Sequence, residues 1–444
     1  MRRYSALSSD PDDPPTSGRT ITGHGPQMTA AASETSVGSP ASPDATGDRG
    51  SRRWFDGLDG VRFIAAFVVL VHHAGFSSAA TFRWDVPGLL FGRMDIGVSI
   101  FFVLSGFLLY RPFVVAQFAG RKAPVRGPFW AKRLVRIFPA YWLAFLILFA
   151  LGTITVKGVS GFFLSFTLLQ VYSTEHAVSG ITQSWSLATE LGFYLLLPFI
   201  AGGARRWAEG RSPSGPRSIN RQALYLLVVC AVLAIVSVIF RVVMAKVSPY
   251  PLESWGALSR LWTPSYLDMF GAGMALAVVS SWAERRSLVR QATESATRRV
   301  GLWWIVSVCA FWFVSTQLDL ARGLETAGVE REILRQTLYC LVALALITPV
   351  VLHGSSPSIG LRALSWRPIA WLGIVSYGIY LWHQAVLKWT HQLLDWPDVS
   401  GNFWVLVTAA LVGSTAIAAL SHRFVEEPAT QIVRQRLRRS SGTR

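Results

Sequence analysis

The sequence predicts an all-α polytopic membrane protein with about ten transmembrane helices and both termini in the cytoplasm. Hydrophobic residues make up 51% of the chain, which also carries 18 tryptophans, more apolar side chains than the core of a soluble protein of this size needs. The mean hydropathy is +0.38. Most of these residues lie in runs long enough for a helix to cross hydrocarbon, and basic residues gather in the connections between the runs.

Three segments follow from this composition. Residues 1–52 are rich in Ser, Pro, Asp, Gly and Thr and contain no apolar run, so we expect a disordered cytoplasmic tail without a secretory signal. Residues 53–428 form the predicted transmembrane domain. The segment 429–444 is basic and is expected to be a second cytoplasmic tail.

The first span is predicted at residues 58–76. Nine more apolar runs follow, at 88–110, 136–153, 183–202, 222–245, 262–282, 301–316, 333–352, 369–390 and 403–422. The run 160–172 is too short to cross unaided, and we expect it to be re-entrant or packed under an outer loop.

The net charge of +17 does not indicate nucleic-acid binding, because the basic residues fall in alternate connections, as the positive-inside rule requires of a multi-pass protein of the cell membrane. The connections predicted to face the cytoplasm hold 18 of them: Arg111, Arg121, Lys122, Arg126, Lys132, Arg133, Arg205, Arg206, Arg211, Arg217, Arg221, Arg285, Arg286, Arg290, Arg298, Arg299, Arg362 and Arg367. The three cysteines lie inside apolar runs without metal-ligand spacing, so neither a disulfide framework nor a metal site is predicted.

The first span carries polar residues at both ends of an otherwise apolar helix. Arg62 and His73 are eleven residues apart, which brings them to within roughly 20° of each other around the helix, whereas His72 lies off that line. Asp59 precedes Arg62 by three residues and falls near the same stripe. Charged groups are costly in hydrocarbon, so this stripe indicates a functional cleft. The alternative is an ordinary span with a snorkelling arginine and interfacial histidines.

Two arginines precede the third apolar run, in the sequence RLVR. Arg133 and Arg136 are three residues apart and share one face at the predicted start of the helix. Two guanidinium groups at the cytoplasmic surface suit phosphate groups, so the pair is a candidate anion clamp. The alternative is routine positive-inside flanking.

Later spans add further polar residues. Glu190 lies in an apolar helix with Ser186 and Tyr194 four residues to either side, and could pair with Arg62, hold a histidine tautomer or form a purely structural ion pair. In the ninth span Tyr380 and His383 continue a polar stripe that begins at Ser376. A last set is assigned to the substrate pocket: Asp59, Ser186, Tyr194, Asp268, Tyr380 and His383.

Taken together, these motifs resemble the membrane acyltransferase-3 family, integral membrane O-acyltransferases with ten spans. The resemblance covers about residues 55–430. Its motifs, in order, are LDGVR followed by His73, FFVLSGFLL, RLVR before IFPAYW, SWSLATELGFYLLLP, SYGIYLWH and FVEEP with Glu426. Many relatives that modify glycans continue into a soluble hydrolase-like domain, and this sequence ends shortly after the tenth run, which leaves the acceptor class open.

The resemblance implies acyl transfer from acyl-CoA, expected to be acetyl-CoA, to a hydroxyl of a carbohydrate, glycolipid or secondary metabolite, without a metal. Under this hypothesis His73 is the general base, Arg62 or Glu190 sets its protonation, and Arg133 and Arg136 bind the donor's phosphates. The competing hypothesis is a proton-coupled transporter or flippase that uses the same Arg, His and Glu as a relay.

Overall fold

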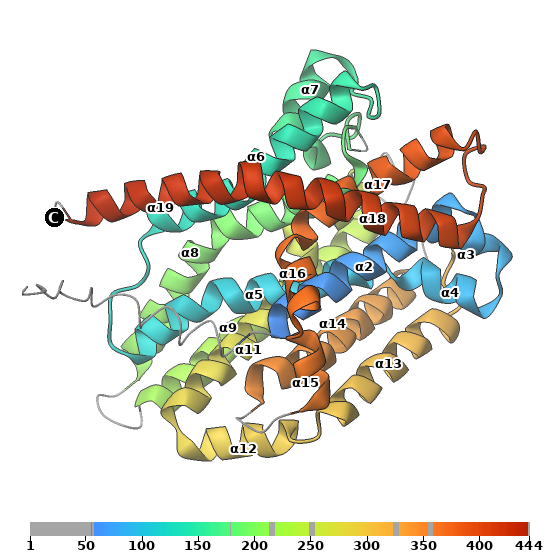
Figure 1. The fold of residues 1–444 in the computed structure, drawn as a ribbon. Coiled ribbons are helices and arrows are strands. Elements are labelled where there is room, and N and C mark those ends of the chain that lie inside the picture. Colours follow the sequence, from blue (N-terminus) through green and yellow to red (C-terminus); the bar gives the residue numbers. More distant parts are fainter. Residues whose placement is uncertain are drawn as a thin grey trace, which may run out of the picture. The chain divides into compact units, whose positions relative to one another are not determined.

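The computed structural model describes residues 55, 57–177, 179–212, 218–247, 254–322, 328–353 and 358–442. These parts of the chain contain helices and no strand (Figure 1). Within these described ranges, eight helical segments are long and apolar enough to cross a membrane, and a bent pair raises the number to nine. The fold is therefore that of an all-α polytopic membrane protein, as predicted. The predicted tail 1–52 lies outside the described residues.

The long helices follow the predicted apolar runs. They are α2 (Gly57–Ser77), α5 (Ile96–Phe118), α6 (Arg126–Ala150), α8 (Trp185–Arg211), α9 (Ser218–Val247), α11 (Leu267–Arg285), α13 (Val300–Thr316), α14 (Val329–Leu352), α17 (Ser376–Leu393) and α18 (Phe403–Ser421). Shorter helices connect them: α3 (Ala80–Arg83), α4 (Val86–Arg93), α7 (Gly158–Phe166), α10 (Trp255–Leu258), α12 (Ser287–Thr297), α15 (Ile359–Leu364), α16 (Arg367–Ile374) and the C-terminal α19 (Glu427–Gly442). The nine residues of α7 are too few to cross a membrane, in line with the prediction for 160–172.

Two of the ten predicted spans differ from the simple pattern. The helix α13 is preceded by α12, and the two meet at 62°, so together they form a broken span or a re-entrant segment. The helix α17 has 18 residues, but His383, Lys388 and His391 keep it too polar to be counted among the apolar candidates. Its buried side chains include both histidines, and it packs against α18 and α2. A helix that carries polar side chains into a protein interior loses the apolar signature of a lipid-facing span.

The third span starts earlier than its apolar run. The helix α6 begins at Arg126, ten residues before the predicted start at 136. Proline is tolerated in the first turn of a helix, so Pro128 does not prevent this extension. Arg133 and Arg136 consequently lie within the helix and not at its first turn, which corrects the predicted position of the pair.

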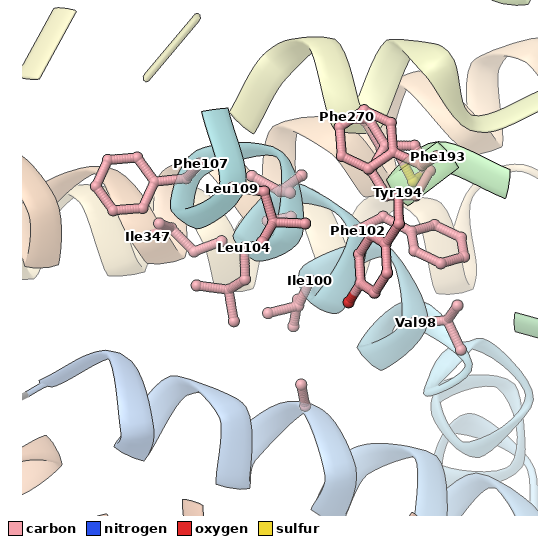
Figure 2. Close-up of a cluster of buried hydrophobic side chains, with 14 of the residues drawn as sticks. Val98, Ile100, Phe102, Leu104, Phe107, Leu109, Phe193, Tyr194, Phe270 and Ile347 are labelled. Carbon is pink, nitrogen blue, oxygen red and sulfur yellow. The ribbon is translucent and has the colours of Figure 1, made fainter. Parts of the chain in front are cut away.

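Glycines set the close packing at the centre of the bundle. A side chain at Gly106 of α5 would overlap the backbone of Phe270, and one at Gly273 of α11 would overlap the backbone of Val103. The two helices therefore approach closely, as small residues permit in membrane bundles. Aromatic rings fill the space beside this contact, and Figure 2 shows Phe193 of α8 close to Phe270, with ring centroids 4.0 Å apart.

Candidate active site

The helix α2 presents Arg62 and His73 at different depths of the bundle. It packs against α5, α16, α17 and α18. Arg62 donates to Asp59 one turn before it on the same helix. Along a helix axis, eleven residues span about 16 Å, so the shared face does not bring Arg62 and His73 into contact. The two residues serve two separate polar spaces.

The first space, here named the arginine cavity, has a volume of about 140 Å³. It brings together seven of the predicted site residues and three that were given other roles or none. The polar lining is Arg62, Ser105, Arg133, Arg136, Ser186, Glu190, Tyr194, Ser376, Tyr377 and Tyr380. Five helices, α2, α5, α6, α8 and α17, contribute these side chains, so the cavity exists only in the folded bundle.

The side chains that line the arginine cavity make few hydrogen bonds with one another. The hydroxyl of Ser105 donates to Glu190, which forms no ion pair within 4.0 Å among the described residues. Ser186 Oγ lies 2.7 Å from Tyr380 Oη. The buried Nε of Arg133 has no hydrogen-bond partner in the described part of the chain. A buried donor without a partner is costly, which indicates that this side of the cavity is built to receive an acceptor.

Glu426 is a cavity neighbour to which the sequence analysis assigned no role. It closes a π-helical turn, His422–Glu426, that continues α18, and its side chain is 4% exposed. Its Oε2 lies 3.6 Å from Nη1 of Arg136. The signal in the sequence was the acidic FVEEP motif directly after the last apolar run, where a carboxylate is expensive unless it has a partner.

The second space is organised by a pair of histidines from α2 and α17. Nδ1 of His73 lies 2.9 Å from the carbonyl oxygen of Val69, and Nε2 of His383 lies 3.1 Å from the same Nδ1. Nδ1 of His383 lies 2.7 Å from the carbonyl oxygen of Tyr380. Carbonyl oxygens only accept, so both Nδ1 atoms carry the proton in neutral rings, and Nε2 of His383 accepts from His73. This assignment leaves Nε2 of His73 with a free lone pair.

His73 also lines a groove of about 570 Å³, here named the histidine groove. Its lining is His73, Phe76, Ser77, Phe82, Gln384, Leu387, Lys388, His391, Asp398 and Val399. His72 turns away from it, with its ring 84° from that of His73 and its Nδ1 2.9 Å from the carbonyl oxygen of Phe91. The two adjacent histidines therefore face different spaces, as the helical wheel predicted.

Several predicted partnerships are corrected by these contacts. His73 was expected to have Arg62 or Glu190 as the neighbour that sets its protonation. Its hydrogen-bonded side-chain neighbour is His383, whereas Arg62 binds Asp59 and Glu190 binds Ser105. Ser105, which lies in the FFVLSGFLL motif, is the hydrogen-bond donor to Glu190. Asp59 holds Arg62 but does not line the arginine cavity.

Asp268 does not belong to the arginine cavity or to the histidine groove. Its Oδ2 lies 2.9 Å from Nη1 of Arg241, and Ser237 donates to its Oδ1 at 3.2 Å. Both partners come from α9, so the carboxylate joins α11 to that helix. The contacts of Asp268 therefore join two helices, and its role in the substrate pocket stays a prediction. Among the described residues, no three His, Cys, Asp or Glu side chains come together as a metal site would require.

The described helices thus form a bundle with a cation-lined cavity and a histidine that hydrogen bonds hold in one orientation. Residues 55–423 match the acyltransferase-3 family, described as "Acyltransferase domain". The match covers most of the chain, so the protein belongs to this family of membrane proteins. No solved structure matches the chain.

Curated relatives include O-acetyltransferases. The putative peptidoglycan O-acetyltransferase YrhL of Bacillus subtilis is 28% identical over 85% of this chain and 55% of its own length. The peptidoglycan O-acetyltransferase OatA of Listeria monocytogenes is 24% identical over 86% of this chain and 56% of its own length. The chain thus spans about half the length of these two relatives. It spans 97% of nodulation protein 10 of Rhizobium leguminosarum, with 26% identity over 87% of this chain.

Proposed function

We propose that the protein transfers an acetyl group from acetyl-CoA to a hydroxyl of a carbohydrate, glycolipid or secondary metabolite. The observation that carries this proposal is the histidine pair, which holds His73 in one tautomer with Nε2 free. An imidazole held in this way is suited to accept a proton from a hydroxyl group. The relatives named as peptidoglycan O-acetyltransferases support a glycan as the acceptor class.

The charge of the arginine cavity suits the donor, and its size limits which part of the donor can enter. Arg133 and Arg136 offer guanidinium groups to phosphates, and Arg62 adds a third cation to the lining. The volume of about 140 Å³ is below the roughly 300–1,000 Å³ of ordinary ligand pockets. The nucleotide part of coenzyme A therefore stays at the mouth of the cavity, and the slender thioester end enters it.

In the proposed reaction His73 acts as the general base. Its Nε2 takes the proton of the acceptor hydroxyl while the hydroxyl oxygen attacks the thioester carbonyl. The tetrahedral intermediate then collapses by breaking the carbon–sulfur bond, and the coenzyme A sulfur leaves with the proton that His73 carried. Proton transfer by a positioned group is typically worth about 10²–10⁴ in rate.

His383 acts through His73 and is a positioning residue. Its Nε2 accepts the Nδ1 proton of His73, which keeps the base in the required tautomer and stabilises the imidazolium that forms during attack. Tyr380 connects this pair to the arginine cavity, because its carbonyl oxygen accepts from His383 and its side chain lines the cavity. The helix α17 therefore contributes to both the proposed thioester site and the support of the base.

The test combines turnover with an untargeted search for the acceptor. The purified full-length protein is incubated with radiolabelled acetyl-CoA, and extracted glycans, lipids and small metabolites of a deletion strain and its parent are compared by mass. We expect label in a product and a missing acetyl group in the deletion strain. A protein that neither binds nor consumes acetyl-CoA, in a strain with unchanged metabolites, would contradict the proposal and favour a transporter.

A further inference from the structure

A third polar space lies beside α2 on the side of His72. This space, here named the outer cavity, has a volume of about 530 Å³. Its charged lining consists of four arginines and two carboxylates: Arg93, Arg241, Arg260, Arg335, Asp95 and Glu332. The volume is in the range of ligand pockets, unlike that of the arginine cavity. Cations outnumber carboxylates in this lining, which favours an anionic occupant.

The ion pairs of the outer cavity leave cationic capacity unused. Arg335 forms ion pairs with both carboxylates of the lining, because it donates to Glu332 and lies 3.3 Å from Asp95. Arg93 donates to the carbonyl oxygen of Ala321, which carries no formal charge. The lining thus holds four arginines and two carboxylates, and Arg335 contacts both carboxylates.

Arg241 provides the strongest local indication. Its side chain is 8% exposed, and Nη1 pairs with Asp268 at 2.9 Å, outside the cavity lining. Its Nε and Nη2 are buried and have no hydrogen-bond partner among the described residues. Unsatisfied guanidinium donors in a buried position cost free energy, and a carboxylate or phosphate would satisfy two of them at once.

The position of the outer cavity connects it to the reacting base. Phe76 lines both the outer cavity and the histidine groove, and its ring packs on that of His72 with centroids 4.8 Å apart. The lining comes from the ends of helices whose connections, 77–87, 246–261 and 317–332, the sequence predicts to face outward. The helix α4, which contacts α13, lies near the end of α13 that is farther from α12 (Figure 1).

We propose that the outer cavity binds the acceptor through an anionic group, a carboxylate or phosphate on the hydroxyl-bearing molecule. This inference rests on the proposed acetyl transfer and adds the charge class of the acceptor. Arg241 and Arg260 bind the anion, and the acceptor's hydroxyl reaches past Phe76 to Nε2 of His73. Neutral glycans of the same size lack the group that these arginines recognise.

The test measures equilibrium binding to the full-length protein in lipid nanodiscs, at constant ionic strength and without donor. The probes are trigalacturonic acid, its fully methyl-esterified form, and inorganic pyrophosphate as a competitor. Two variants address the cavity: Arg260→Gln removes a cation, and Arg241→Lys keeps the pair with Asp268 but removes the spare donors. Arg331→Gln is the matched control, because Arg331 is exposed at the same end of the bundle and lies outside the lining.

We expect the acid to bind and its ester not to, with affinity about tenfold weaker or more in Arg260→Gln and Arg241→Lys. Displacement by pyrophosphate would identify phosphate as a group the cavity accepts, whereas resistance would restrict it to carboxylates. Equal binding of acid and ester, no saturable binding of either anion, or an equal loss in Arg331→Gln would overturn the inference.

The last measurement of this binding test adds acetyl-CoA as a competitor of the acid. If it displaced the acid, and Arg260→Gln weakened both ligands alike, the outer cavity would be the donor site and the inference would fail. Because binding is read without turnover, an inactive protein that still prefers the acid contradicts only the acetyl-transfer proposal. An active protein without that preference contradicts only the anion site.

Discussion

Glu190 and Asp268 are two carboxylates in apolar helices of one bundle, and they have opposite surroundings. Asp268 has an arginine at 2.9 Å and a serine hydroxyl at 3.2 Å, both from α9. Glu190 has a serine hydroxyl, faces the arginine cavity and has no ion pair within 4.0 Å among the described residues. The fold satisfies the carboxylate of Asp268, whereas the carboxylate of Glu190 can still bind a ligand or take part in a reaction.

Charged groups inside a membrane bundle can be divided by how completely their partners satisfy them. A charged group in hydrocarbon needs a partner, but a partner that satisfies it completely leaves nothing for chemistry. Variants at fully paired groups should therefore cost stability, and variants at groups with spare capacity should cost activity. The four predictions below test this division, in order of decreasing expected effect.

The largest effect is expected at His73, whose Nε2 has spare capacity. His73→Ala should lower acetyl transfer by about 10²–10⁴, because it removes the general base. His72→Ala should cause a much smaller loss, since His72 binds the carbonyl oxygen of Phe91 and the contact with His383 is made by His73. Transfer from radiolabelled acetyl-CoA is measured at matched protein levels. Reversed phenotypes in equally abundant proteins would contradict the assignment of the base.

Asp268→Ala should cost about 3–5 kcal/mol of unfolding free energy, because it leaves Arg241 as an uncompensated buried charge. Adding Arg241→Met should restore most of this loss by removing the charge as well. Thermal unfolding followed by fluorescence size-exclusion chromatography checks both variants. If Asp268→Ala folded normally but was inactive, Asp268 would belong with Glu190 and the comparison would fail.

Arg136→Ala should weaken coenzyme A binding by roughly one to two powers of ten, since a charge-assisted contact to phosphate contributes about 1.5–3 kcal/mol. Arg136→Lys should recover part of it, because the charge stays but the fork is lost. The measurement is calorimetric titration with acetyl-CoA and with acetyl-pantetheine, which lacks the nucleotide phosphates.

The control for this experiment is Arg136→Ala combined with Glu426→Gln. Glu426 is buried against Arg136, so the single variant leaves an unpaired carboxylate that the double variant neutralises. Both should lose acetyl-CoA affinity and keep acetyl-pantetheine affinity. An equal loss for the two donors, or recovery of acetyl-CoA binding in the double variant, would exclude a phosphate clamp.

The smallest change in stability is expected for Glu190→Gln. The amide oxygen can still accept the hydroxyl of Ser105, so the unfolding free energy should change by less than about 1 kcal/mol. Transfer should fall nevertheless, because the carboxylate charge is lost from the arginine cavity. The same thermal and radiolabel assays apply. A loss of stability as large as that of Asp268→Ala would show that Glu190 is a structural residue after all.

The sequence by itself determined the local features of this protein. Apolar runs long enough to cross hydrocarbon predicted the long helices, because backbone groups in lipid must be satisfied within each segment. Helix periodicity separated His72 from His73, since the direction of a side chain around a helix depends only on residue spacing. Spacing also placed Asp59 one turn from Arg62, where the two form an ion pair.

Tertiary structure decided which polar groups meet. Periodicity gives the direction of a side chain but neither its depth nor its neighbour, so the contact of His73 with His383, 310 residues later, could not be predicted from α2 alone. The partners of Glu190 and Asp268 were likewise hidden, because Ser105 and Arg241 lie on other helices. The apolar signal of α17 is low in part because the bundle buries two of its polar side chains, His383 and His391.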